Sequence, residues 1–364
     1  MDGHVTEEVG YLAVYSPQLS GTVNINGTDV PYLLQAQSVD HRFVPVLSSD
    51  IKLEEEKSKD NEVNHIDETV SILALGDKIF TQDISSSGGD TAAIRRLAPE
   101  YGAAMEWGTV DGVDHNWMKI PLAKEYLNPV VVAKPVSSRG GDPGVIRIRN
   151  VSHNSFELRY NEWAYKDGWH IQERVFYMVV EAGERSVAGL TVEAGRLDSS
   201  KLLADGWEPI TFSAFFSQTP SIFTSVQTYN GADPVTTRLS NCTFAGFDLT
   251  MDEEEAIRSG GHTTETIGWV AIKKGTGNTN DNRSVVVLSN STSHIPTQIN
   301  FGQVMARRFP IVITDMITTY GGDPCFLRYQ DLGPSSIDLF IQEEASSDTE
   351  MNHTTEGVSV FVAE

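Results

Sequence analysis

The sequence lacks the features that mark several common classes of protein. Its only two cysteines, Cys242 and Cys325, show no motif spacing, which excludes a disulfide framework and a CxxC redox or zinc site. No stretch approaches the roughly 18 apolar residues of a membrane span. The first residues, MDGHVTEEVG, have neither the basic nor the apolar region of a secretion signal.

Basic residues are also scarce. The 364 residues include 27 Lys and Arg against 50 Asp and Glu, so the formal net charge is −23. A charge of this sign repels phosphate backbones and anionic lipid surfaces. We therefore expect no nucleic acid partner and no insertion into a membrane.

Motifs of catalysis are missing as well. The chain has no G-x-S-x-G, no phosphate-binding glycine loop and no H-E-x-x-H. We predict a protein without enzymatic activity, cofactor or metal site. Calcium at the acidic runs LEEEKSKD (53–60) or DEEEA (252–256) stays an alternative, although neither run has the ligand order of an EF-hand and acidic runs are more often solvated surface.

What the sequence does contain is a repeat. A pattern of the form His-x-x-Glu followed by alternating apolar residues occurs five times, beginning at His4, His65, His170, His262 and His353. The alternation is typical of a β-strand, on which His and the Glu three residues later point to opposite faces. The motif is therefore not a helical zinc-ligand pair, and the chain is a tandem array.

Further positions recur at constant spacing. An apolar run opens at a proline before each of the last four histidines, at Pro31, Pro129, Pro220 and Pro310. After three of these runs come an Asp-Pro turn, an arginine, an apolar residue and a glutamate, in steps of 5, 9 and 6 residues. The polar members are Asp142, Arg147 and Glu162; Asp233, Arg238 and Glu253; and Asp323, Arg328 and Glu343.

These recurring polar positions have an architectural interpretation. Each glutamate stands eight to ten residues before its histidine, across a predicted hairpin, where it can accept a hydrogen bond from the imidazole. We expect each arginine to hold the Asp-Pro turn of its own repeat to its strand. Since a fold requirement recurs in every copy and an active site rarely does, we predict that these columns, His65, His170, His262 and His353 included, are structural.

The strand spacing predicts an all-β fold of tandem antiparallel β-sandwich modules. We place an extra N-terminal strand at 1–19, a degenerate unit at 20–85, and three units at 86–188, 189–275 and 276–364. One short helix is expected in the segment that starts at Gly88. The extra strand predicts either pairing with the sheet edge of another molecule, which builds oligomers or fibres, or origin in a longer array.

Several segments together resemble a known family. The stretches NPVVVAKPVSS, FELRYNEW and ERVFYMVVEAG, between about residues 113 and 188, are similar to the H-type lectin module of snail agglutinins. That resemblance implies a six-stranded antiparallel sandwich, often trimeric, that binds N-acetylgalactosamine-type sugars. By alignment the family's sugar-binding arginine falls on Pro143 and its histidine on Ala164, next to the matching Trp163, so the binding residues are not kept.

Candidate sites remain for glycans. Tryptophan faces complement the C–H face of a pyranose, so Trp163 and Trp169, with Asp142 and Arg147, are candidate carbohydrate-binding residues. Six Asn-x-Ser/Thr sequons are glycosylation candidates: Asn26, Asn150, Asn241, Asn282, Asn290 and Asn352.

The sequence as a whole favours an extracellular or cell-surface protein of adhesive or structural function, with glycans and further copies of itself as partners. The alternative is a carbohydrate-binding accessory fragment of a secreted polysaccharide-degrading enzyme.

Overall fold

The computed structural model describes residues 105–257 and 260–364, and before them six strands between residues 20 and 83, whose backbone alone is considered. The chain divides into two compact units, 1–99 and 100–364. The expected N-terminal strand at His4, the histidine His65, the sequon at Asn26 and the expected helix between Gly88 and Ala104 lie outside the described residues.

The first unit contains a four-stranded antiparallel sheet of order β1-β2-β5-β6 and a small hairpin, β3-β4. Their bounds are β1 (Ser20–Ile25), β2 (Thr28–Val39), β3 (Val44–Val46), β4 (Ser49–Ile51), β5 (Glu68–Leu75) and β6 (Lys78–Asp83).

The register of β2 against β5 tests how the degenerate unit aligns with the others. Tyr32, the residue after Pro31, pairs with Leu75, ten residues after His65. In the second unit, too, the residue after each proline pairs with the residue ten positions after the histidine. These pairs are Val130 with Val180, Ser221 with Ile272 and Ile311 with Ala363. The first unit therefore shares the central strand pair of the repeat.

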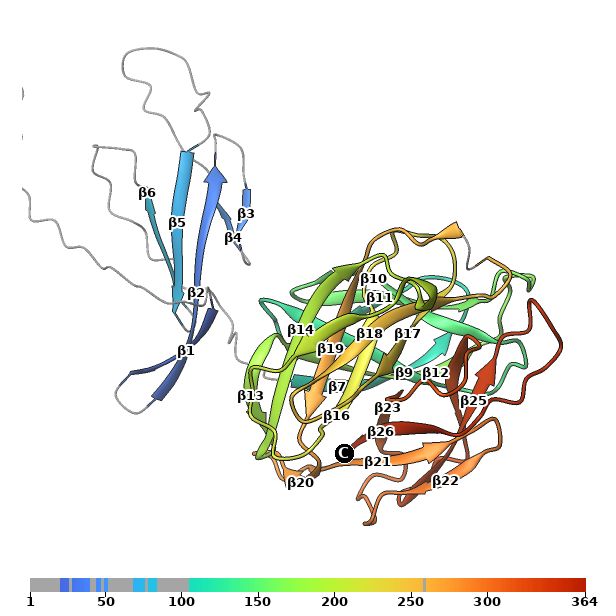
Figure 1. The fold of residues 1–364 in the computed structure, drawn as a ribbon. Helices are drawn as coiled ribbons and strands as arrows, with labels where there is room; N and C mark the ends of the chain where they lie inside the picture. Colours follow the sequence, from blue (N-terminus) through green and yellow to red (C-terminus); the bar gives the residue numbers. More distant parts are fainter. Residues whose placement is uncertain are drawn as a thin grey trace, which may run out of the picture. The chain divides into compact units, whose positions relative to one another are not determined.

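The second unit holds three modules of the same plan (Figure 1). In each, the closing His-x-x-Glu strand lies between two neighbours in one sheet, and the Phe- or Ile-to-Glu strand lies between two neighbours in another. The first sheet of module 1 and the second sheet of module 3 join into one six-stranded sheet. Module 1 consists of β7 (Met105–Val113), β8 (Met118–Pro121), β9 (Pro129–Ser137), β10 (Gly144–Ser152), β11 (Ser155–Glu162) and β12 (Glu173–Glu181).

Modules 2 and 3 each add a short edge strand. Module 2 consists of β13 (Gly183–Val187), β14 (Leu190–Ser199), a 3-10 turn η1 (Leu203–Asp205), β15 (Glu208–Thr211), β16 (Ser221–Val226), β17 (Val235–Ser240), β18 (Gly246–Glu253) and β19 (Glu265–Ile272). Module 3 consists of β20 (Gly275–Asn278), β21 (Ser284–Thr292), β22 (Thr297–Asn300), β23 (Ile311–Met316), β24 (Cys325–Gln330), β25 (Ser336–Glu343) and β26 (Glu356–Ala363). Because β13 pairs with β14, the segment before residue 188 joins the sheet of module 2.

The all-β prediction is confirmed, and the modules are packed on one another. The proline strands β9, β16 and β23 contact each other, and every residue in all three is buried. β9 also pairs in parallel with β24 of module 3 at two positions. A strand buried on both faces has no solvent-facing position, which explains why each proline run contains adjacent apolar residues rather than alternating ones.

Candidate functional site

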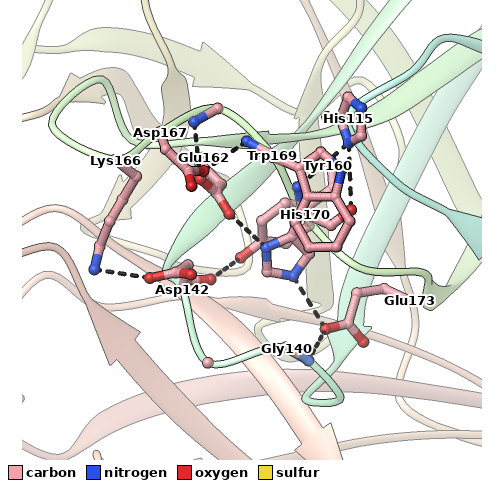
Figure 2. A network of polar contacts seen from close by, with 12 residues as sticks. His115, Gly140, Asp142, Tyr160, Glu162, Lys166, Asp167, Trp169, His170 and Glu173 are labelled. Carbon is pink, nitrogen blue, oxygen red and sulfur yellow. Dashed lines mark hydrogen bonds and ion pairs between the residues drawn. The ribbon is translucent and has the colours of Figure 1, made fainter.

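The recurrent histidines occupy three equivalent sites, which we call nodes 1, 2 and 3 after the module of their histidine. In node 1, His170 Nδ1 lies 2.8 Å from Glu162 Oε1 and Nε2 lies 3.2 Å from Glu173 Oε1 (Figure 2). His262 stands in the same way between Glu253 and Glu265, and His353 between Glu343 and Glu356. The predicted hairpin hydrogen bond is present in all three modules.

The second glutamate of each node, the one in the motif itself, also binds the loop after the proline strand. Glu173 Oε1 accepts a hydrogen bond of 2.7 Å from the Gly140 amide, and Oε2 accepts bonds from the Arg139 amide and the Ser137 hydroxyl. The equivalent donors to Glu265 are Thr228, Asn230 and Gly231, and those to Glu356 are Thr318, Tyr320 and Gly321. A buried carboxylate thereby satisfies loop donors that lack a sheet partner.

A glycine in each loop leaves room for the imidazole. A Cβ atom added at Gly140 would lie 2.6 Å from His170 Nε2, and the glycines Gly231 and Gly321 face His262 and His353 in the same way. These glycines stand eleven residues after each proline, so the column is visible in the sequence. A glycine carries no functional group, however, and so the column did not indicate contact with the imidazole.

The arginines connect one module to another, which corrects our prediction for them. Arg147 of module 1 donates to the backbone oxygen of Asp233 in module 2, not to its own Asp142 turn. Its Nη2 lies 2.7 Å from Glu265 Oε1, and both side chains are fully buried. Sequence spacing alone could not show that the arginine reaches the next module. When residues recur at constant spacing, a contact within one copy and a contact between two copies give the same pattern.

The same link occurs at the other two interfaces. Arg238 of module 2 donates to Asp323 O at 3.1 Å and lies 3.8 Å from Glu356 of module 3. Arg328 of module 3 donates to Asp142 O at 3.4 Å and to Glu173 of module 1 at 2.8 Å. The links run from module 1 to 2, from 2 to 3 and from 3 back to 1, so they close a ring.

Burial and hydrogen bonding set the charges in these nodes. Burial lowers the pKa of His262, but its bonds to Glu253 and Glu265 outweigh that effect and raise the pKa to about 9. For His353, burial is likewise outweighed by Cys325, Glu356 and Glu343, and the pKa rises to about 10. Both imidazoles are therefore cationic at neutral pH.

The pKa of Glu265 shifts in the opposite direction. Burial raises the pKa of Glu265, but hydrogen bonds from His262, Thr228 and the loop amides outweigh it and lower the pKa to about 2. In node 2 the Glu265 carboxylate therefore faces one imidazolium and one guanidinium. This balance of charge is suited to holding modules together.

A second polar group lies where the three proline strands meet. The central cluster consists of Lys134 from module 1, Thr224, Ser225 and Thr237 from module 2, and Asp315 from module 3, all buried. Lys134 Nζ lies 2.8 Å from Asp315 Oδ1 and 2.7 Å from Thr237 Oγ1. Lys134, Ser225 and Asp315 stand in one repeat column, five residues after the proline, yet all three differ. Because their charges differ, these residues form no recurring pattern in the sequence.

The carbohydrate-binding candidates divide into two pairs. Trp163 is fully buried in the core of module 1 and Arg147 is fully buried in node 2, so both predictions were wrong for a surface site. Trp169 is 59% exposed, and its ring stands beside His115 (Figure 2). Asp142 is also exposed and pairs with Lys166 at 2.8 Å.

The sequon asparagines that the structure describes are all exposed. Asn150, Asn241 and Asn282 have φ of 50°, 49° and 59°, and Asp331, in the same repeat column as Asn150 and Asn241, has 48°. Asn and Asp tolerate this left-handed conformation better than other non-glycine residues. Turn geometry therefore accounts for asparagine at Asn150 and Asn241 whether or not a glycan is attached.

Within 105–257 and 260–364, no group of three or more His, Cys, Asp or Glu side chains is placed to hold a metal ion. In the same part of the chain no helix is long and apolar enough to cross a membrane.

Comparison with known proteins gives one relative. The chain is 32% identical over 250 residues to Halomucin of Haloquadratum walsbyi, in a match that covers 66% of this chain. The chain spans about 3% of the length of that relative. No family model matches the chain. No solved structure matches it either.

Proposed function

We propose that this chain is a structural or adhesive component that works outside the cell and has no enzymatic activity. The observation that carries the proposal is the ring of three nodes, in which the recurrent His, Glu and Arg side chains are buried and bonded to one another. Residues arranged in this way stabilise an assembly of modules and are not accessible to a substrate.

The relative supports the location. Halomucin carries a mucin-like name, and the 32% identity to it over 250 residues is what supports a location outside the cell. We propose an extracellular or cell-surface location on that ground. The test is surface labelling of intact source cells with a membrane-impermeant amine reagent, followed by detection of the labelled chain. Labelling only after lysis would contradict the proposal.

Carbohydrate binding is proposed at the exposed surface of module 1, around Trp169 and Asp142. Trp169 offers an indole face to solvent, and the ion pair of Asp142 and Lys166, drawn across His170 and Tyr160 from it, supplies hydrogen-bonding groups (Figure 2). The H-type lectin resemblance supports this function and does not supply its binding residues. It also makes the ring of three modules a single-chain counterpart of the family's trimer.

A glycan array of neutral and acetamido sugars tests this site. Selective binding that is lost in Trp169→Ala supports it. Phe215→Ala, which removes an aromatic side chain that is 81% exposed in module 2, is the matched control and should bind as the original chain does. Absence of any neutral-sugar binding would leave the structural function alone.

A further inference from the structure

An arginine-tryptophan cluster lies at the boundary of modules 1 and 2. Trp117, just before β8, has the guanidinium carbons of Arg149 and Arg159 at 4.0 and 4.7 Å from its ring centroid. Tyr229 of module 2 packs edge-on to Trp117, with ring centroids 5.2 Å apart, and lies 4.9 Å from the guanidinium of Arg159. All four side chains are partly exposed.

The charges in this cluster are not balanced. Glu157 lies between Lys119 and Arg149 across three strands and pairs with Arg149 at 2.7 Å. Arg159 donates from Nη2 to Asn161 and to the Tyr229 hydroxyl, both uncharged, and its Nε has no hydrogen-bond partner. Three cationic side chains therefore share one carboxylate, in a chain whose net charge is −23.

The fold does not require this arrangement. Arg159 stands directly across the strand pair from Arg147, and like charges in that position are destabilising. In modules 2 and 3 the position of Arg159 holds Thr250 and Phe340. The position of Arg149 holds Ser240 and Gln330. The same fold is thus built twice without either guanidinium, whereas the node residues recur in every module.

We propose that this cluster, Lys119, Arg149 and Arg159 around Trp117 and Tyr229, binds the anionic group of an acidic polysaccharide. A guanidinium carries five N–H donors in a planar fork that matches a carboxylate or a sulfate, and Arg159 keeps donors that no protein carboxylate uses. Trp117 and Tyr229 fix the guanidinium planes, so less side-chain entropy is lost on binding. The site is separate from the Trp169 surface and goes beyond the function proposed there.

The experiment measures binding of the full chain to three polysaccharides that differ in charge. Polygalacturonate presents carboxylates, dextran sulfate presents sulfates, and dextran presents neither. Titrations in about 0.15 M salt reduce the repulsion from the rest of the molecule, because the Debye length there is about 8 Å. We expect one or both anionic polymers to bind and dextran not to bind, and the preferred polymer identifies the anion.

Variants then assign the binding to the cluster. Arg159→Gln and Lys119→Gln, the latter at an exposed position, should each weaken binding, Arg159→Gln by about tenfold. The matched control is Arg283→Gln, because Arg283 also stacks on a tryptophan, Trp107, but is neutralised by Asp281 at 2.8 Å. If Arg159→Gln disturbs folding, Lys119→Gln alone carries the test.

Two results would overturn the proposal. One is the absence of binding to both anionic polymers. The other is that Arg283→Gln weakens polymer binding as much as Arg159→Gln does, which would show general attraction between charges and no specific site. Trp169→Ala should abolish binding of neutral sugars and leave binding of the anionic polymers unchanged. The proposal for this cluster and the proposal for the Trp169 surface can therefore fail independently.

Discussion

The three nodes and the central cluster hold the same modules together with opposite designs. Each node repeats one set of residues, His, two Glu and Arg, at every interface. The central cluster places three different residues, Lys134, Ser225 and Asp315, in one repeat column. Identical contacts can close any three copies into a ring, but three lysines or three aspartates at one buried point would repel each other. The nodes therefore provide cohesion, and the central cluster specifies which modules meet.

The largest expected effect comes from removing the best-bonded node arginine. Arg328 donates to six oxygen atoms, among them Glu173 and Ser137, whereas the Nε atoms of Arg147 and Arg238 have no partner. We expect Arg328→Leu to lower the free energy of unfolding by about 3–5 kcal/mol, because it leaves buried acceptors unpaired.

Urea denaturation measures that change. Arg238→Leu should cost less, since the Arg238 guanidinium lies 3.8 Å from Glu356. The exposed control Arg283→Leu should stay within about 0.5 kcal/mol of the original chain. An equal cost for Arg328→Leu and Arg283→Leu would show that the ring contacts do not stabilise the unit.

The central cluster can be tested by a double-mutant cycle. Asp315→Leu leaves Lys134 buried without its carboxylate, and we expect a cost of about 3 kcal/mol or more. Lys134→Met combined with Asp315→Leu should recover most of it, because neither charge then remains buried. Additive costs in the double variant would argue against a coupled pair.

A smaller effect is expected where the nodes need space. Gly140→Ala brings a methyl group against the His170 ring and should cost about 1–3 kcal/mol. The adjacent Gly141→Ala meets nothing within 4 Å and is the matched control. Thermal unfolding of the two variants side by side measures the difference, and equal midpoints would mean that the imidazole moves aside freely.

A pH dependence is a further difference that the nodes should show and the aromatic core should not. The folded pKa values of His262 and His353, about 9 and 10, lie above the ordinary value of 6.5. Their contribution to stability is therefore fully present below pH 6.5 and is lost as the pH rises through 9 and 10. The pKa of Glu265 falls from 4.5 to about 2, so its contribution is present above pH 4.5 and is lost as the pH falls toward 2.

The urea midpoint measured from about pH 5 to pH 10.5 should show this alkaline decline, and the decline should be shallower in His262→Gln. A midpoint that stays constant up to pH 10 would mean that the imidazoles are neutral in the folded protein.

Local contacts were predictable from the sequence. The glutamate and histidine of a node stand eight to ten residues apart across one hairpin, so strand pairing alone brings them together. The proline strands, the closing strands and the left-handed turns at Asn150 and Asn241 also follow from local pattern. Trp163 was misassigned because an aromatic residue at a strand end has the same local sequence whether it faces the core or solvent.

What the sequence by itself determined is one module: its strands, its turns and the hairpin bond of its histidine, because these depend on residues that are near each other along the chain. Only the tertiary structure decided that Arg147 reaches Glu265 of the next module, that Lys134 meets Asp315, and that Trp117 stands between two arginines. Those contacts join residues up to 181 positions apart. A repeat with uniform spacing gives every copy the same neighbours along the chain, and only packing in space selects the partner.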